Sequence, residues 1–154
     1  MKLRTLVLLC SLAGYSSSFA QSAGCNASAF RQVVAGASAS ISALHDGNSK
    51  LFQEKLQKLR ALNNWPEAEY IAKATPFVKD ETTASIDSAN KELLTKVQSL
   101  EAAKAATEPG RCAMLEELKA SMETILANTS AKWQHMFSKL EQASAEPLQA
   151  GLTQ

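Results

Sequence analysis

The sequence predicts an all-α fold: an elongated three-helix bundle that runs up, down and up, with a kinked first helix and a short connector helix. Three observations lead to this prediction. After the first 20 residues, no stretch alternates apolar and polar residues as a half-buried strand would. The composition favours good helix formers, chiefly Ala, Leu, Lys, Glu and Gln. Apolar residues recur every three or four positions over long stretches, and prolines and glycines fall mostly between those stretches.

Residues 1–20 have the three parts of a secretory signal peptide. Lys2 and Arg4 form a charged start, and the apolar run from Thr5 to Leu12 is too short to span a bilayer. Ser18 and Ala20 then supply small residues at the −3 and −1 positions of a cleavage site. The alternatives are a membrane anchor or an ordinary buried helix. We therefore expect an exported protein, periplasmic or secreted.

The sequence that follows the signal peptide is long enough for one domain with one modest core, which we place at residues 21–146. Without Lys2 and Arg4, basic and acidic residues are nearly balanced and form no basic cluster. Such a chain has no field that would attract nucleic acid or anionic lipid. The three residues before Cys25 lack the apolar residue of a lipoprotein site, so we also expect no stable membrane anchor.

Two cysteines, Cys25 and Cys112, are left after the signal peptide, because Cys10 belongs to it. In an oxidising compartment, two remaining cysteines most simply bond to each other. Closing so long a loop could stabilise the fold by about 4 kcal/mol in the chain-entropy model. The alternatives are two buried free thiols or an intermolecular bridge.

The first helix is expected from about Ala27 to Leu62. Asp46-Gly47-Asn48-Ser49 interrupts its pattern, and the apolar stripe resumes beyond this segment with its phase shifted by one residue. Either the helix kinks at Gly47, or the chain turns back there. The stripe consists of Phe30, Val34, Ala37, Ile41, Leu44, Phe52, Leu56 and Leu59.

The rest of the chain divides into a connector and two long helices. A short connector helix is expected over Trp65–Ala74, and Thr75-Pro76 is expected to begin the second long helix. The third is expected to follow a break at Thr107–Gly110 and to end at Glu146-Pro147, before a flexible tail at 147–154. The expected core positions of these two long helices are Phe77, Ile86, Leu93, Val97 and Leu100, and then Leu115, Leu118, Met122, Ile125, Trp133, Met136 or Phe137, and Leu140.

The expected disulfide favours the three-helix topology. If the first helix only kinks at Gly47, the first and third long helices start at the same end, which brings Cys25 and Cys112 together. If the chain reverses at Gly47, Cys112 tends to fall at the opposite end. A compact four-helix bundle is therefore the alternative fold.

Residue patterns for catalysis and for metal or cofactor binding are not found. Neither His45 nor His135 has a second His, Cys or Glu three or four residues away on the same helix face. The sequence has no Cys-x-x-Cys-His, no Gly-x-Ser-x-Gly elbow and no phosphate-binding glycine loop. We therefore expect no enzyme, no metal and no cofactor.

One family resembles the chain in outline: the small secreted haem-binding helical proteins of mycobacteria, which also place a cysteine near each of two helix starts. The similarity covers Cys25–Ser28 and Gly110–Cys112 alone. No ligand residue is carried over from so short a match.

The segment from Asn63 to Phe77 concentrates three of the few aromatic residues that follow the signal peptide: Trp65, Tyr70 and Phe77. They could anchor a partner or plug the end of the bundle. From the absence of catalytic patterns we expect a non-catalytic exported protein that binds another protein through a helix face, as an adaptor, a chaperone-like protein or an inhibitor. The alternative is a carrier that holds a small apolar or haem-like ligand between its helices, because the methionines of the last helix pack adaptably.

The first prediction concerns export. The exported protein should begin at Gln21 or within two residues of it, because Ser18 and Ala20 form the cleavage site. N-terminal sequencing of extracytoplasmic material measures this directly. Recovery of intact Met1 from that fraction would rule out the signal peptide.

Overall fold

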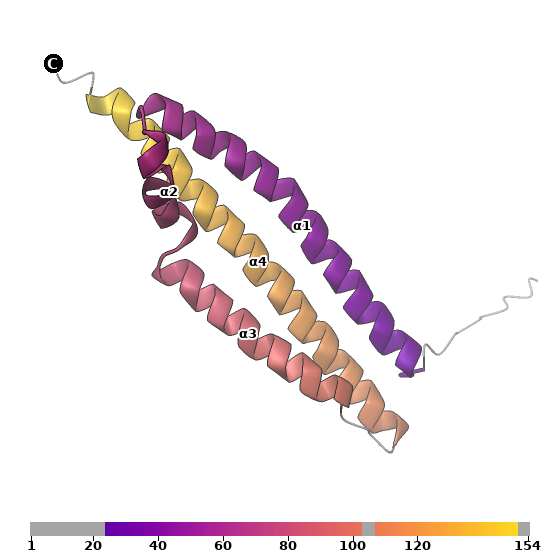
Figure 1. The fold of residues 1–154 in the computed structure, drawn as a ribbon. Coiled ribbons are helices and arrows are strands. Elements are labelled where there is room, and N and C mark those ends of the chain that lie inside the picture. Colours follow the sequence, from indigo (N-terminus) through magenta and orange to yellow (C-terminus); the bar gives the residue numbers. More distant parts are fainter. Residues whose placement is uncertain (1–23, 103–106, 151–154) are drawn as a thin grey trace, which may run out of the picture.

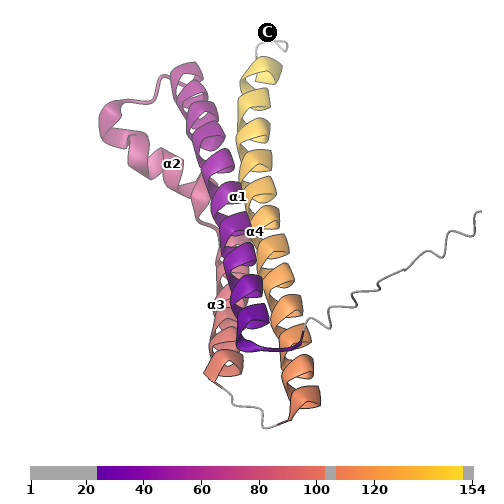
Figure 2. The same cartoon turned by 90° about the vertical axis from the view of Figure 1, so that its right-hand side faces the viewer.

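The computed structural model describes residues 24–102 and 107–150. These residues form an all-α bundle, as predicted, in which α1 runs up, α2 and α3 follow each other down, and α4 runs up again (Figures 1 and 2). The expected signal peptide and positions 151–154 of the expected tail lie outside the described residues. The elements are α1 (Ala27–Leu62), the 3₁₀ turn η1 (Glu67–Glu69), α2 (Tyr70–Val78), α3 (Glu81–Ala102) and α4 (Glu108–Ala150).

Helix α1 continues through Gly47 without interruption. Its 36 residues are helical throughout, and no glycine among the described residues has a positive φ, so the chain does not reverse at this point. Asn48 Nδ2 donates to the Leu44 carbonyl at 2.7 Å, a bond that turns the polar side chain back onto the helix. Figure 1 shows α1 bowed in its middle part, and the apolar residues on both sides of Gly47 pack toward α4. The reversal at Gly47 that the four-helix alternative assumed is therefore not present.

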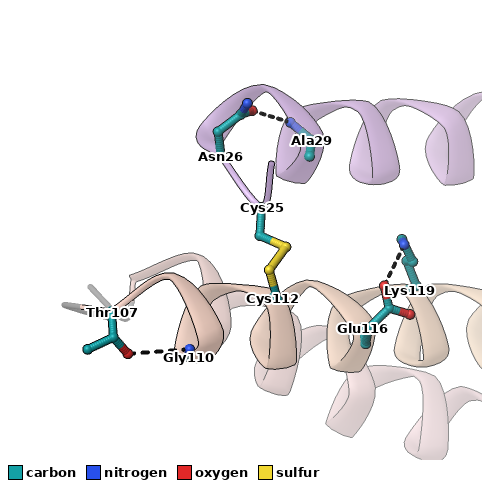
Figure 3. Close-up of a disulfide and its surroundings, with 8 residues drawn as sticks. All are labelled: Cys25, Asn26, Ala29, Thr107, Gly110, Cys112, Glu116 and Lys119. Carbon is teal, nitrogen blue, oxygen red and sulfur yellow. Dashed lines mark hydrogen bonds and ion pairs between the residues drawn. A yellow bond between two sulfur atoms is a disulfide. The ribbon is translucent and has the colours of Figure 1, made fainter. Parts of the chain in front are cut away.

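Asparagines close both ends of α1. The Asn26 side-chain oxygen accepts from the backbone N–H groups of Ser28 and Ala29, at 2.9 and 3.1 Å (Figure 3). At the other end, Asn63 Nδ2 donates to the Leu59 carbonyl at 2.9 Å. Asn64 follows with a φ of 51°, a left-handed conformation that asparagine tolerates better than most residues. These caps fix where the chain leaves α1.

The core consists of two clusters, one at each end of the bundle. We call the first the disulfide-end cluster, because Cys25 and Cys112 are bonded beside it with their Cα atoms 4.9 Å apart (Figure 3). Its third wall, beside α1 and α4, is α3. The second, which we call the far-end cluster, has α2 and the η1 region as its third wall. The buried residues are Val97, Leu115, Leu118, Met122 and Ile125 in the disulfide-end cluster, and Phe52, Leu56, Leu59, Met136 and Leu140 in the far-end cluster.

The second long helix starts later than predicted. Thr75 and Pro76 lie inside α2, and α3 begins only at Glu81. A reciprocal cap supplies the start: Thr83 N–H donates to Asp80 Oδ1, and Asp80 N–H donates to Thr83 Oγ1, both at 2.9 Å. This pair satisfies the backbone N–H groups of Asp80 and Thr83 at the start of α3. The connector and the long helix are therefore divided at Asp80, not at Pro76.

Helix α4 is longer than predicted at both ends. It starts at Glu108, where Thr107 Oγ1 accepts from Gly110 N–H at 3.4 Å, and it continues through Pro147 to Ala150 (Figure 3). The expected boundary at Glu146 was wrong, because a proline removes one backbone donor but leaves the following residues able to bond to earlier carbonyls. Residues 147–150 therefore belong to the helix.

The second prediction concerns Gly47. Gly47→Ala should raise the free energy of unfolding by about 0.5–1 kcal/mol, because a helical glycine is costly and nothing lies within 4 Å of the added Cβ. Gly36→Ala is the matched control, since Gly36 lies in the same helix with equally open space. Thermal unfolding with the disulfide intact measures both. A loss of stability in Gly47→Ala alone would show that the bow of α1 depends on glycine.

Candidate functional site

The three aromatic residues of the connector pack together on the far-end cluster. Trp65, Tyr70 and Phe77 are all partly buried against its core residues. The rings of Trp65 and Phe77 stack with their centroids 6.2 Å apart. This placement makes them part of the third wall of the far-end cluster, beside α1 and α4. Contact of these side chains with a partner stays a prediction.

Arg60 fixes the turn that carries these aromatics. Its guanidinium lies over the Tyr70 ring, 4.9 Å from the centroid, and its Nε donates to the Trp65 carbonyl at 3.4 Å. The same guanidinium pairs with the Glu67 carboxylate. Gln57 Nε2 also donates to the Tyr70 hydroxyl, at 3.3 Å. The connector is thus tied to α1 by polar contacts at its start.

A polar seam holds α3 and its cap against α4. Asn128 Nδ2 donates to Asn90 Oδ1 at 2.9 Å, and Lys132 Nζ donates to both carboxylate oxygens of Asp87, at 2.6 and 2.7 Å. Further along, Asp80 contacts two more side chains of α4. The pairs follow the two helices in antiparallel order, so they set the register of α3 on α4.

Asp80 is the acid of the seam with the most polar contacts to α4. Its carboxylate binds the Lys139 ammonium, and it lies 2.7 Å from His135 Nε2. Lys139 also donates to the Pro76 carbonyl, which ties the end of α2 to α4. The Lys139 ammonium first, and then His135 and the Thr83 N–H, hold the pKa of Asp80 far below its usual range. The carboxylate is therefore charged at any ordinary pH and serves as a cap and a tether together.

The two histidines lie in different surroundings. His135 belongs to the polar seam, whereas the His45 ring packs beside Trp133 with centroids 5.7 Å apart. Within residues 24–102 and 107–150, no three side chains of His, Cys, Asp or Glu gather in a way that could hold a metal ion. None of the helices in these ranges is long and apolar enough to cross a membrane.

One hollow lies on the side of the α1–α4 pair that we call the open face. Helices α2 and α3 lie together on one side of that pair (Figures 1 and 2). At the far end, a hollow of about 620 Å³ runs between α1 and α4, lined by Leu51, Leu62, Leu140 and Ala145 with charged residues around them. The side chains of Leu51 and Leu62 are 45% and 61% exposed. Two large apolar side chains are thus presented to solvent beside an apolar floor.

A second hollow continues the open face toward the disulfide. It has a volume of about 200 Å³, and its apolar lining is Val33 and Ala37 of α1 with Met122 and Leu126 of α4. Leu51 lies about four helical turns beyond Ala37, and Leu140 lies about four turns beyond Leu126, so both hollows fall on one stripe of each helix. The open face therefore runs along much of the bundle.

This surface is not among the features predicted from the sequence. Leu51 and Leu62 stand outside the predicted stripe of the first helix, and no motif marks them. Their spacing from Ala37 could have shown that they share a second helix face. Whether a neighbouring helix covers that face depends on the packing of the whole bundle.

No protein-family model, curated protein or solved structure matches this chain. The haem-binding helical proteins that resemble its outline therefore add no residue roles. What the protein does has to be inferred from the geometry of its own surface.

The third prediction tests the charge on Asp80. Asp80→Asn should keep the helix cap, because asparagine caps as well as aspartate, but it should lower the free energy of unfolding at pH 7. Because the pKa of Asp80 is depressed in the folded protein, its stabilisation is complete above about pH 5. It falls away as the pH drops through about 4, where the unfolded chain takes up the proton.

Urea unfolding of both proteins from pH 7 to pH 3 measures this effect. The stability difference should shrink on acidification. Asp87→Asn is the control: it removes another carboxylate of the seam, one that is more exposed and pairs with Lys132 alone. A difference for Asp80→Asn that stays constant down to pH 3 would contradict the assignment.

Proposed function

We propose that this is an exported, non-catalytic bundle protein that binds another protein by seating one amphipathic helix of that partner on its open face. The observation that carries the proposal is the hollow of about 620 Å³ between α1 and α4, with Leu51 and Leu62 exposed at its edges. Apolar residues grouped beside a hollow are typical of interaction sites, whereas single exposed leucines are not.

The fold itself supports a helix as the occupant. On their covered side, α1 and α4 pack against α2 and α3. The groove between α1 and α4 on that side is therefore filled by helices of the protein itself. The open face offers a second groove between the same two helices. Ridges of side chains three and four residues apart fit such a groove, and a partner helix would supply them at that spacing.

Charged groups around the hollow add a second requirement on the partner. Lys55 pairs with Glu141 across the groove at 3.1 Å, and Lys58 and Glu54 stand beside them. Both signs of charge therefore border the apolar floor. A partner helix that fits carries apolar residues along one stripe and residues of both charges on its flanks.

The proposed compartment is periplasmic or extracellular. The Cys25–Cys112 disulfide fits an oxidising compartment, and the N-terminal features predict export. An adaptor, a chaperone-like protein and an inhibitor all use a face of this kind. The partner's identity decides among these roles.

The fourth prediction places the partner on the open face. A photo-crosslinking amino acid at position 62, in cells that make the protein, should form an adduct with one partner segment. The same amino acid at position 71 should not. Ile71 is the matched control, because it is also apolar and 73% exposed but belongs to α2, away from the open face.

A synthetic peptide of the crosslinked segment then gives the affinity by fluorescence anisotropy. The double variant Leu51→Asp/Leu62→Asp should weaken its Kd by at least about tenfold, since two buried leucine contacts are lost. Ile71→Asp should leave the Kd unchanged. Equal adducts at positions 62 and 71, or a double variant that binds as tightly as the native protein, would exclude the open face as the binding site.

A further inference from the structure

A separate pocket lies at the waist of the bundle, where the chain passes from α2 to α3. It has a volume of about 290 Å³ and is built from all four helices. Trp133 and Met136 of α4 form its apolar floor, His45 of α1 forms one wall, and Asp87 and Asn90 of α3 form the other. The break at Asp80 creates the pocket, because neither α2 nor α3 covers this part of α4 completely.

The floor suits a flat apolar ring. Met136 is 6% exposed, so its position is set by the core. Trp133 packs against the rings of His45 and Phe52, with centroid distances of 5.7 and 6.0 Å. An indole and a thioether held in place offer a stacking surface and a sulfur contact to an aromatic ligand. An aliphatic ligand would use only part of this surface.

The walls supply hydrogen bonds without a net charge. Asn90 accepts through Oδ1 from Asn128, whereas its Nδ2 donates to no atom within the described ranges. The Asp87 carboxylate is already neutralised by Lys132 at 2.6 and 2.7 Å. A ligand that meets these walls gains most from an acceptor placed at Asn90 Nδ2, and it gains little from a charge of its own.

We propose that the waist pocket binds a small, neutral, planar aromatic molecule of one or two fused rings that carries a carbonyl acceptor. The volume is at the lower limit of small-molecule sites, which run from about 300 to 1,000 Å³, and it selects this size over a macrocycle. The pocket is distinct from the open face, so this proposal does not rest on the proposed partner. It gives the carrier function a definite place in the bundle and a definite ligand class.

Coumarin is a suitable probe, because it has two fused rings, no charge and one exocyclic carbonyl. NMR titration of the disulfide-bonded protein should show saturable shifts of the Trp133 indole N–H and the Asn90 side-chain amide, with half-saturation below about 1 mM. The Trp65 indole N–H is the internal control, since Trp65 packs in the far-end cluster outside the pocket, and it should not move.

Three comparisons separate specific binding from apolar partition. Asn90→Ala should weaken coumarin binding about fivefold, the effect of one lost hydrogen bond. Ser88→Ala changes an exposed residue of α3 outside the pocket lining and should leave the affinity unchanged. Naphthalene, which lacks the carbonyl, should bind to the native protein more weakly than coumarin does. To the Asn90→Ala variant, naphthalene and coumarin should bind about equally well. If Asn90→Ala does not fold, His45→Ala replaces it as the test variant. His45 lies at an exposed position, and its loss should weaken coumarin binding.

The proposal is overturned by any of three results. One is a titration without saturation up to the solubility limit of coumarin. Another is a Trp65 shift that follows the Trp133 shift. The last is equal binding of coumarin and naphthalene to the native protein. Loss of partner binding in the open-face variants leaves this titration unchanged, so the two proposals fail independently.

Discussion

Helix α4 is the element on which the rest of the fold depends, because α1, α2 and α3 all make their main contacts with it. Among the residues that the structure describes, it contributes six of the ten buried apolar ones and reaches both clusters, so the two cores are held together by one continuous helix. Its 43 residues correspond to about 65 Å at 1.5 Å per residue. No other helix contributes buried residues to both clusters, and a break within α4 would separate the two halves of the bundle.

The neighbours of α4 are positioned by different interactions. The Cys25–Cys112 disulfide ties the start of α1 to the start of α4 and so fixes these two helices as parallel. Polar pairs from Asp80 to Asn90 align α3 in the opposite direction. Most of these pairs are partly exposed, so each adds little to stability, and their main effect is to exclude other registers. Apolar burial drives the association of the helices, and the disulfide and the polar pairs determine how they align.

Both candidate binding surfaces follow from this arrangement. Because α2 and α3 occupy one side of the α1–α4 pair, the other side keeps a groove with Leu51 and Leu62 at its edge. Because the descending segment is divided at Asp80, the floor of α4 at Trp133 is left accessible between α1 and α3. Both surfaces are lined by residues of regular helices, so neither needs an irregular loop.

The sequence by itself determined the helical class, the extent of α1, the disulfide pair and nearly all of the buried positions, including Phe52, Leu56 and Leu59. These features depend on periodicity, helix propensity and the number of cysteines, and all three can be read directly from the sequence. Tertiary structure decided whether the chain continues through Gly47, because packing along α4 outweighs a weak local breaker. It also placed the start of α3 at Asp80, through a cap completed by Lys139 and His135 of α4. The exposure of Leu51 and Leu62 and the pocket at Trp133 could not be predicted from the sequence. Each depends on how the helices are placed around one another, and the residue pattern within one helix carries no information about its neighbours.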